Sequence, residues 1–280
     1  MAGIEAVLFD WAGTVIDFGS RAPVVAMDGV FAAEGVALHE DIIRRFMGKA
    51  KREHVIAILS EPYIGARWHE AKGSDWTEAD VDRLMVALEP AMQAAATEHS
   101  QLIPGAATAV SALRHKGVRI GSTTGYTRTM MAGILPAAAA QGYAPDVTIC
   151  AGETAQGRPA PLMLWAAMAQ LRAWPAGRCI AVDDAPVGIE AGRNAGVWTV
   201  GIVASGNGLG LDAAAWAALV GSEQAARLAP VIEAFRAAGA DFVIPSVADL
   251  AVAIRAIEEA IDAGRLPGGA PTVALSCPGA

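Results

Sequence analysis

Residues 4–14 are Ile-Glu-Ala-Val-Leu-Phe-Asp-Trp-Ala-Gly-Thr, and they begin with the kind of short apolar run that forms a buried strand. The run ends at a carboxylate, Asp10, which is soon followed by the small residues Ala12 and Gly13. In an open α/β sheet the ligand crevice lies beyond the carboxyl ends of the strands. This stretch therefore indicates an α/β fold and places Asp10 where chemistry is usually carried out.

The rest of the chain alternates short apolar runs with helical patterns. The runs lie at 118–123, 146–150, 178–182, 198–203 and 241–244. The helical patterns lie at 106–116, 127–141 and 161–171, and the first two stop before a glycine, as helices often do. This alternation predicts an α/β fold with a Rossmann-like parallel sheet core that helices cover on both faces.

One block interrupts the alternation. Between residues 21 and 100 there is no convincing strand, and helical stretches lie near 23–34, 40–59 and 78–98. Because this block directly follows the first strand and its loop, we predict a helical cap domain inserted into the core. The predicted domains are the core at 1–20 and 101–263, the helical cap at 21–100, and a flexible tail at 264–280 that is rich in Gly and Pro.

Composition narrows the class of protein. The 280 residues carry a net charge of −8, which argues against a nucleic-acid partner but leaves room for a local cationic pocket. No run reaches the roughly 18 apolar residues of a spanning helix, so no membrane association is expected. The first residues lack a basic segment, and Cys150, Cys179 and Cys277 are odd in number and far apart, so we expect a cytoplasmic, reduced protein.

Three further motifs stand at the ends of predicted strands or before a helix. Gly121-Ser-Thr-Thr-Gly125 offers hydroxyls and backbone N–H groups to phosphate oxygens, and Arg158 offers a fork of donors. The adjacent carboxylates Asp183 and Asp184 repel each other unless a cation is present, and Mg²⁺ is the natural one. Taken singly, each motif also fits an ordinary turn, a surface arginine or a solvated acidic loop.

In their order, these motifs resemble the haloacid dehalogenase superfamily, and the resemblance extends over nearly the whole chain, including the cap. The family pattern is a nucleophilic Asp, a Thr or Ser, a Lys or Arg, and then acidic Mg²⁺ ligands. The resemblance implies Asp10 as nucleophile; Asp10, the carbonyl of Ala12 and Asp184 (Asp183 as second choice) as Mg²⁺ ligands; and Thr124 or Thr123 with Arg158 as phosphoryl-binding residues.

Ala12 departs from the commonest form of this pattern. Most phosphatases of the superfamily carry a second Asp there, which acts as general acid and is worth roughly 10²–10⁴ in rate. The cap instead supplies Met47-Gly-x-x-Lys51-x-x-His54. Together with 10–19 and 121–128, and extended by 192–196 and 198–201, this pattern resembles the phosphonatase family within the superfamily.

That closer resemblance implies hydrolysis of the P–C bond of phosphonoacetaldehyde to acetaldehyde and phosphate. Lys51 would form a Schiff base with the aldehyde, and Asp10 would become an aspartyl-phosphate. His54 and Met47 stand three and four residues from Lys51, so we expect both on its helical face, His54 as a proton shuttle. Lys49 is expected to point elsewhere. Tyr126 and Trp11 are expected to line the pocket.

Other functions remain as alternatives. A phosphatase or phosphomutase is disfavoured by Ala12. A dehalogenase, which needs no Mg²⁺, is disfavoured by Lys51 and the paired aspartates, and an inactive binding protein by the full set of motifs. The Gly-rich stretch 206–210 lacks the spacing of a dinucleotide loop. Gly188 replaces an acidic residue found in some relatives, and the apolar stretch 24–36 is compatible with the homodimer, formed through the cap, that is common among them.

Overall fold

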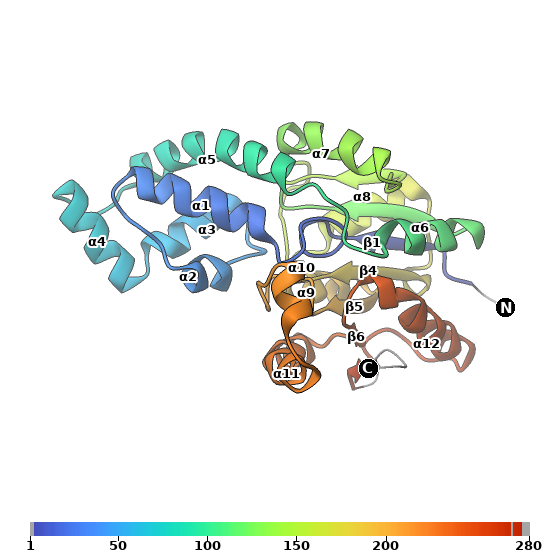
Figure 1. Ribbon diagram of the computed structural model, residues 1–280. Helices are drawn as coiled ribbons and strands as arrows, with labels where there is room; N and C mark the ends of the chain where they lie inside the picture. Colours follow the sequence, from blue (N-terminus) through green and yellow to red (C-terminus); the bar gives the residue numbers. More distant parts are fainter. Residues whose placement is uncertain (1–2, 270, 276–280) are drawn as a thin grey trace.

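The computed structural model describes residues 3–269 and 271–275, and within them a seven-stranded parallel sheet forms the centre of the molecule (Figure 1). The strand order is β3-β2-β1-β4-β5-β6-β7. The strands are β1 (Ala6–Phe9), β2 (Arg119–Thr123), β3 (Val147–Ile149), β4 (Cys179–Asp183), β5 (Trp198–Ile202), β6 (Phe242–Ile244) and β7 (Val273–Ala274). The predicted fold class, an α/β parallel sheet with a helical insertion, is confirmed.

Helices cover both faces of the sheet. They are α6 (Ala106–His115), α7 (Arg128–Ala140), α8 (Leu162–Leu171), α9 (Pro186–Ala195), α10 (Ala213–Ala218), α11 (Gly221–Ala238) and α12 (Leu250–Asp262). Alternation along β1 explains the two layers, because successive side chains of a strand point to opposite faces. Val7 and Phe9 belong to a buried cluster with residues of α6, α7 and α12, whereas Leu8 belongs to a second cluster with residues of α8 and α9.

The insertion between β1 and α6 is entirely helical, and it lies to one side of the sheet (Figure 1). It consists of α1 (Arg21–Ala33), α2 (Glu40–Arg45), α3 (Lys51–Leu59), α4 (Pro62–Lys72) and α5 (Glu78–Glu98). Apolar side chains of the insertion belong to the same buried cluster as Val7 and Phe9 of β1, and within it the rings of Phe31 and Trp68 meet edge to face with their centroids 6.4 Å apart. We call this insertion the cap.

The cap differs from the sequence prediction at two places. The stretch 40–59 is not one helix, because Gly48 takes a φ of +90°, a left-handed conformation that ends a helical path. Helix α4 was not predicted. It has Pro62 in its first turn and stops at Gly73, whose φ is +76°, so the usual start and stop residues were present in the sequence.

Three sequence expectations concern features outside the site. Part of the tail, Val273–Ala274, pairs with β6, whereas residue 270 and residues 276–280, with Cys277, lie outside the described residues. Cys150 and Cys179 are buried free thiols. Among the described residues, no helix is both long enough and apolar enough to cross a membrane.

Candidate active site

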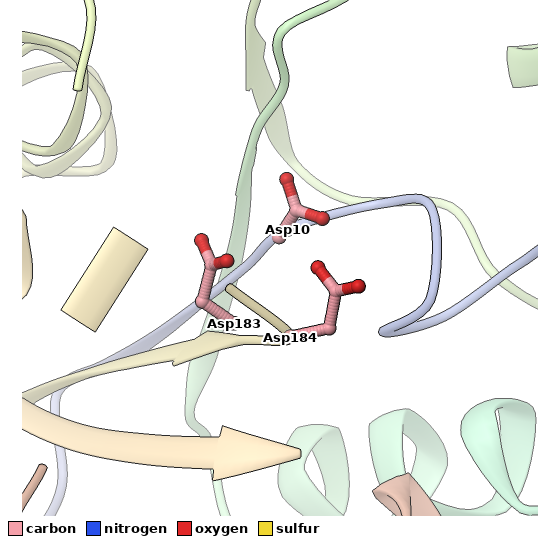
Figure 2. A group of neighbouring side chains, drawn as sticks. All are labelled: Asp10, Asp183 and Asp184. Atoms are coloured by element: carbon pink, nitrogen blue, oxygen red, sulfur yellow. The ribbon is translucent and has the colours of Figure 1, made fainter. Parts of the chain in front are cut away.

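Three neighbouring strands of the sheet end side by side. In the register of the sheet, Phe9 of β1 pairs with Ser122 of β2 and with Val182 of β4. One residue further along each strand stand Asp10, Thr123 and Asp183, and Asp184 follows. Figure 2 shows the carboxylates of Asp10, Asp183 and Asp184 gathered at this edge. Strand pairing therefore brings together residues that lie more than a hundred positions apart.

The three carboxylates form a buried acidic cluster. One oxygen from each lies within 4.8 Å of the others. Burial raises the pKa of Asp183 to about 7, although Arg158 opposes the shift. Burial, followed by the charges of Asp10 and Asp183, also raises the pKa of Asp184. A buried all-oxygen donor set with excess negative charge is what a hard divalent cation requires, so these residues fit a metal ion.

Arg158 partly balances this charge from the loop between β3 and α8. Its side chain is buried, and its Nη2 donates to Asp10 Oδ1 and lies 3.3 Å from Asp183 Oδ2. The same nitrogen donates to Thr123 Oγ1 at 3.3 Å. Burial opposes the guanidinium charge, but the carboxylates of Asp183 and Asp10 raise the pKa of Arg158 above its ordinary value. A permanent cation thus stands beside the predicted nucleophile, where a phosphoryl group would need one.

Two glycines make room for the aspartates. Gly13 has a φ of +80°, and a Cβ there would lie 2.2 Å from Asp184 Oδ2. A Cβ on Gly188, in the first turn of α9, would lie 2.0 Å from Asp183 Cγ. The glycine that departs from some relatives at position 188 therefore has a physical reason in this chain. The carboxylate of Asp183 already fills the space that any side chain would need.

Replacing Gly188 with alanine should therefore push Asp183 out of place. We expect a loss of about 1–3 kcal/mol in the free energy of unfolding, together with weaker binding of a divalent cation. Chemical denaturation and a metal titration by calorimetry would measure both effects. Gly221→Ala, in the first turn of α11, is the matched control because a Cβ there meets nothing within 4 Å. Equal stability and equal metal affinity in the two variants would contradict the account.

The cap closes a pocket over the strand ends. The core side of the pocket is lined by Asp10, Ala12, Ser20, Thr124, Gly125, Tyr126, Arg158, Asp184, Ala185 and Asn207. The cap side is lined by Pro23, Met47, Gly48, Lys49 and Lys51. Most of the predicted site residues thus share one pocket, although they come from two parts of the chain.

Lys51 is the first residue of α3. Burial lowers the pKa of its amine to about 8, Asp10 opposes this shift, and Arg158 adds to it. At neutral pH roughly a tenth of such an amine is uncharged, against well under a thousandth for an ordinary lysine whose pKa is about 10.4. The amine of Lys51 thus has the lowered pKa that a nucleophilic lysine would need, and it lines the same pocket as Asp10.

The turn before α3 changes how its neighbours reach the pocket. Met47 and Lys49 lie in the non-helical segment 46–50, so neither shares a helical face with Lys51. Met47 lines the pocket through this turn. Lys49, which was expected to point elsewhere on the same helix, is exposed and is among the residues that line this pocket.

His54 does not fit the predicted proton shuttle. It is fully buried and is absent from the residues that line the pocket. Its Nε2 lies 2.9 Å from the carbonyl oxygen of Ile43, and because a carbonyl only accepts, this nitrogen carries the proton. Burial, followed by the charge of Lys51, lowers the pKa of His54 to about 3. The imidazole therefore remains neutral at working pH.

Of the two aromatic residues that were expected to line the pocket, only one does so. Trp11 does not line the pocket: it is fully buried and packs edge to face on Tyr143, with ring centroids 5.1 Å apart. Tyr126 does line it, and within the described part of the chain its buried hydroxyl has no hydrogen-bond partner. The backbone N–H of Tyr126 donates to Thr124 Oγ1 at 3.1 Å, which fixes the threonine at the pocket wall.

Sequence reasoning missed two residues that hold Asp184. Ser20 donates its hydroxyl to Asp184 Oδ2 at 3.1 Å, and the backbone N–H of Asn207 donates to the same oxygen at 2.7 Å. Asn207 belongs to the Gly-rich stretch 206–210, whose place directly after a predicted strand was the available signal. Ser20 carried no motif that would have marked it.

Comparison with known proteins agrees with this fold. The family model of haloacid dehalogenase-like hydrolases matches residues 4–196. The chain is 44% identical to phosphonoacetaldehyde hydrolases of Paraburkholderia xenovorans and Paraburkholderia phytofirmans, over 95% of this chain and 100% of each relative. A crystal structure of a phosphonoacetaldehyde hydrolase-like protein from Oleispira antarctica superposes with a TM-score of 0.93 at 39% identity, covering 95% of this chain and 96% of that one.

The fold and the aspartate cluster define a hydrolase of the haloacid dehalogenase-like class. Similarity to relatives over their full length narrows the assignment from this class to one family. Within this class, the chain belongs to the phosphonoacetaldehyde hydrolase family.

Proposed function

We propose that this protein hydrolyses the P–C bond of phosphonoacetaldehyde, giving acetaldehyde and phosphate. One juxtaposition carries the proposal. An amine with a lowered pKa, Lys51, lines the same pocket as the carboxylate Asp10 and the phosphoryl-binding guanidinium of Arg158. Ala12 stands where a phosphoester hydrolase would need its general acid, and a lysine suits an aldehyde instead.

In the first step the uncharged amine of Lys51 attacks the aldehyde carbon. The carbinolamine takes up one proton from solvent, loses water and leaves a protonated imine. This imine is needed because simple cleavage of a P–C bond would expel a carbanion, a very poor leaving group. His54, buried and neutral behind the pocket, contributes no proton to this step in our account.

In the second step a carboxylate oxygen of Asp10 attacks phosphorus, and the P–C bond breaks. The electron pair of the broken P–C bond forms a C=C bond, while the π electrons of the imine move onto the Lys51 nitrogen. The product on Lys51 is an enamine. Protonation at carbon and hydrolysis of the resulting imine release acetaldehyde and free Lys51. Water then hydrolyses the aspartyl-phosphate. We propose that Arg158, with Thr124 and Thr123, holds the phosphonate oxygens throughout.

We propose Mg²⁺ as the resident metal ion. Asp10, Asp184 and the carbonyl of Ala12 would hold it, with Asp183 as second choice. When bound, it would offset the repulsion between the carboxylate of Asp10 and the phosphonate dianion. The support for this assignment is the buried all-oxygen donor set.

Removing the metal should abolish turnover. Dialysis against a chelator should lower activity to the background rate, because the anionic nucleophile and the anionic substrate would then repel each other in a buried site. Added Mg²⁺ should restore the activity, and Ca²⁺, which is larger and tolerates irregular ligand geometry, should restore much less. Full activity in chelator would instead favour the dehalogenase alternative, which needs no metal.

The function itself is tested by measuring products. With Mg²⁺ and phosphonoacetaldehyde, acetaldehyde and phosphate should appear in equal amounts. Simple phosphate monoesters and 2-haloacids should be turned over far more slowly, because neither offers an aldehyde to Lys51. Preferential release of phosphate from a monoester, or of halide from a haloacid, would identify one of the alternative activities.

We further propose a homodimer formed through the cap, and the cytoplasm as the compartment. Along α1, Val25, Gly29 and Ala32 form an exposed stripe of small or apolar residues, with Val25 49% exposed. Light scattering on Val25→Asp should show a monomer if this stripe is the interface. The compartment is supported by the buried free thiols of Cys150 and Cys179.

A further inference from the structure

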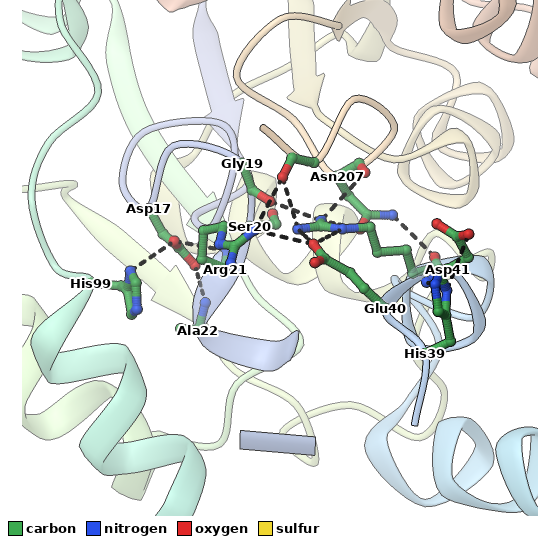
Figure 3. A network of polar contacts seen from close by, with 12 residues as sticks. Asp17, Gly19, Ser20, Arg21, Ala22, His39, Glu40, Asp41, His99 and Asn207 are labelled. Atoms are coloured by element: carbon green, nitrogen blue, oxygen red, sulfur yellow. Dashed lines mark hydrogen bonds and ion pairs between the residues drawn. The ribbon is translucent and has the colours of Figure 1, made fainter. Parts of the chain in front are cut away.

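Arg44, in the last turn of α2, joins the cap to the core. Its side chain is only 12% exposed. Nη1 donates to the carbonyl of Gly19 at 2.8 Å and to Asn207 Oδ1 at 3.1 Å, and Nη2 donates to the carbonyl of Gly210 at 3.1 Å. Nε donates to Glu40 on the same helix at 2.7 Å. Figure 3 shows this network around Gly19, Glu40 and Asn207.

The loop after β5 is shaped to receive this side chain. Asn207 Nδ2 donates back to the carbonyl of Arg44 at 3.2 Å, so the two residues are bonded in both directions. Gly210 has a φ of +70°, and a Cβ there would lie 2.6 Å from Arg44 Nε. The backbone N–H of Asn207 also holds Asp184, so the loop that receives Arg44 touches the acidic cluster directly.

Arg44 lies close along the chain to the turn that lines the pocket. Helix α2 ends at Arg45, and the turn 46–50 then leads directly to Lys51. The turn lies close against the core, because a Cβ on Gly48 would lie 2.4 Å from Val187 Cγ1 of α9. Whatever fastens the end of α2 therefore also fixes the turn that lines the pocket.

We propose that Arg44 is a positioning residue of the reaction: by fastening the end of α2 to Gly19 and to the loop 207–210, it holds Lys51 over Asp10. This inference rests on the proposed function. Lys51 is surrounded by Asp10 and Arg158 from the core and by Lys49 and His54 from the cap. Burial dominates the lowered pKa of its amine, so loosening the cap should admit water and return that pKa toward about 10.4.

The experiment compares Arg44→Ala with Arg45→Ala. Arg45 is the next residue on the same helix, but its side chain is 57% exposed and pairs with Glu61 inside the cap. Competitive labelling of lysines with an amine reagent across pH, read by peptide mass spectrometry, gives the pKa of Lys51 without any substrate. We expect Arg45→Ala to match the unmodified protein and Arg44→Ala to shift the midpoint upward by at least about one unit.

Kinetics on phosphonoacetaldehyde supply the second measurement. In Arg44→Ala, kcat near neutral pH should fall about tenfold for each unit of that shift, because fewer amines are uncharged, and KM should rise. Arg44→Lys, which keeps one donor, should recover part of both losses. Identical labelling profiles in Arg44→Ala and Arg45→Ala would overturn the inference, and so would a loss of activity with an unmoved Lys51 profile.

A second variant guards against misfolding of the first. Asn207→Ala keeps the backbone N–H that holds Asp184 but removes the side chain that Arg44 grips, so it should move the Lys51 profile in the same direction. No shift in that variant would count equally against the inference. Because labelling uses no substrate, an unmodified protein that fails to hydrolyse phosphonoacetaldehyde would refute the proposed function and leave this test intact.

Discussion

Replacing Lys51 with alanine should reduce turnover of phosphonoacetaldehyde on the order of 10⁴-fold or more, because the electron sink for P–C cleavage is lost. The fold and the metal site should survive, since Lys51 is a pocket-lining residue with partial exposure. Initial rates, with circular dichroism and a metal titration as checks, would measure this. Lys51→Arg should be equally inactive, because a guanidinium keeps the charge but is always protonated and forms no imine.

Lys72→Ala is the control for loss of a cap lysine. Lys72 pairs with Glu34 at 2.6 Å, away from the pocket, and its replacement should leave turnover unchanged. Substantial activity in Lys51→Ala would remove the imine from the account. It would leave Asp10 acting on a substrate that needs no lysine, as in a phosphatase.

Replacing Asp10 with asparagine should be as damaging, on the order of 10⁴-fold or more, because an amide does not attack phosphorus. The position is buried and sterically matched by asparagine, so the chain should still fold. The imine on Lys51 should still form, since that step does not use Asp10 as nucleophile. Rapid-quench measurement of phosphate, beside an assay of imine formation, separates the two steps.

The two chemical steps therefore predict two distinct inactive proteins. Lys51→Ala retains the nucleophile but lacks the imine, whereas Asp10→Asn retains the imine but lacks the nucleophile. Phosphate release by Asp10→Asn at a rate near that of the unmodified protein would overturn the whole assignment of the site.

Strand pairing explains why so much was predictable. Asp10, Thr123 and Asp183 end adjacent strands, and a parallel sheet delivers such residues to one edge whatever their separation in sequence. For the helical cap, no equivalent rule predicts which side chains come together. Gly48 breaks the stretch that was interpreted as one helix, so Met47 does not share the helical face of Lys51 that was predicted for it.

Contacts between distant loops were also beyond sequence reasoning. Asn207 holds Asp184 through a backbone N–H, an interaction that no side-chain motif announces. The spacing of His54 from Lys51 correctly placed both on one helix, but spacing does not report burial. Packing against α2 leaves His54 buried and bonded to Ile43, so our account gives it no part in proton transfer. The fold and the gathering of candidate residues at the strand ends thus followed from the sequence pattern. The burial of individual side chains could be learned only from the structure.

The most direct test of the lysine–aspartate mechanism is peptide mass spectrometry after borohydride reduction in the presence of phosphonoacetaldehyde. Borohydride reduces any imine on Lys51 to a stable secondary amine. The unmodified protein should carry an ethyl group on Lys51, left after the P–C bond has broken, whereas Asp10→Asn should carry an uncleaved phosphonoethyl group on the same residue. Label on another lysine, no label at all, or an ethyl group on Lys51 of Asp10→Asn would contradict the account.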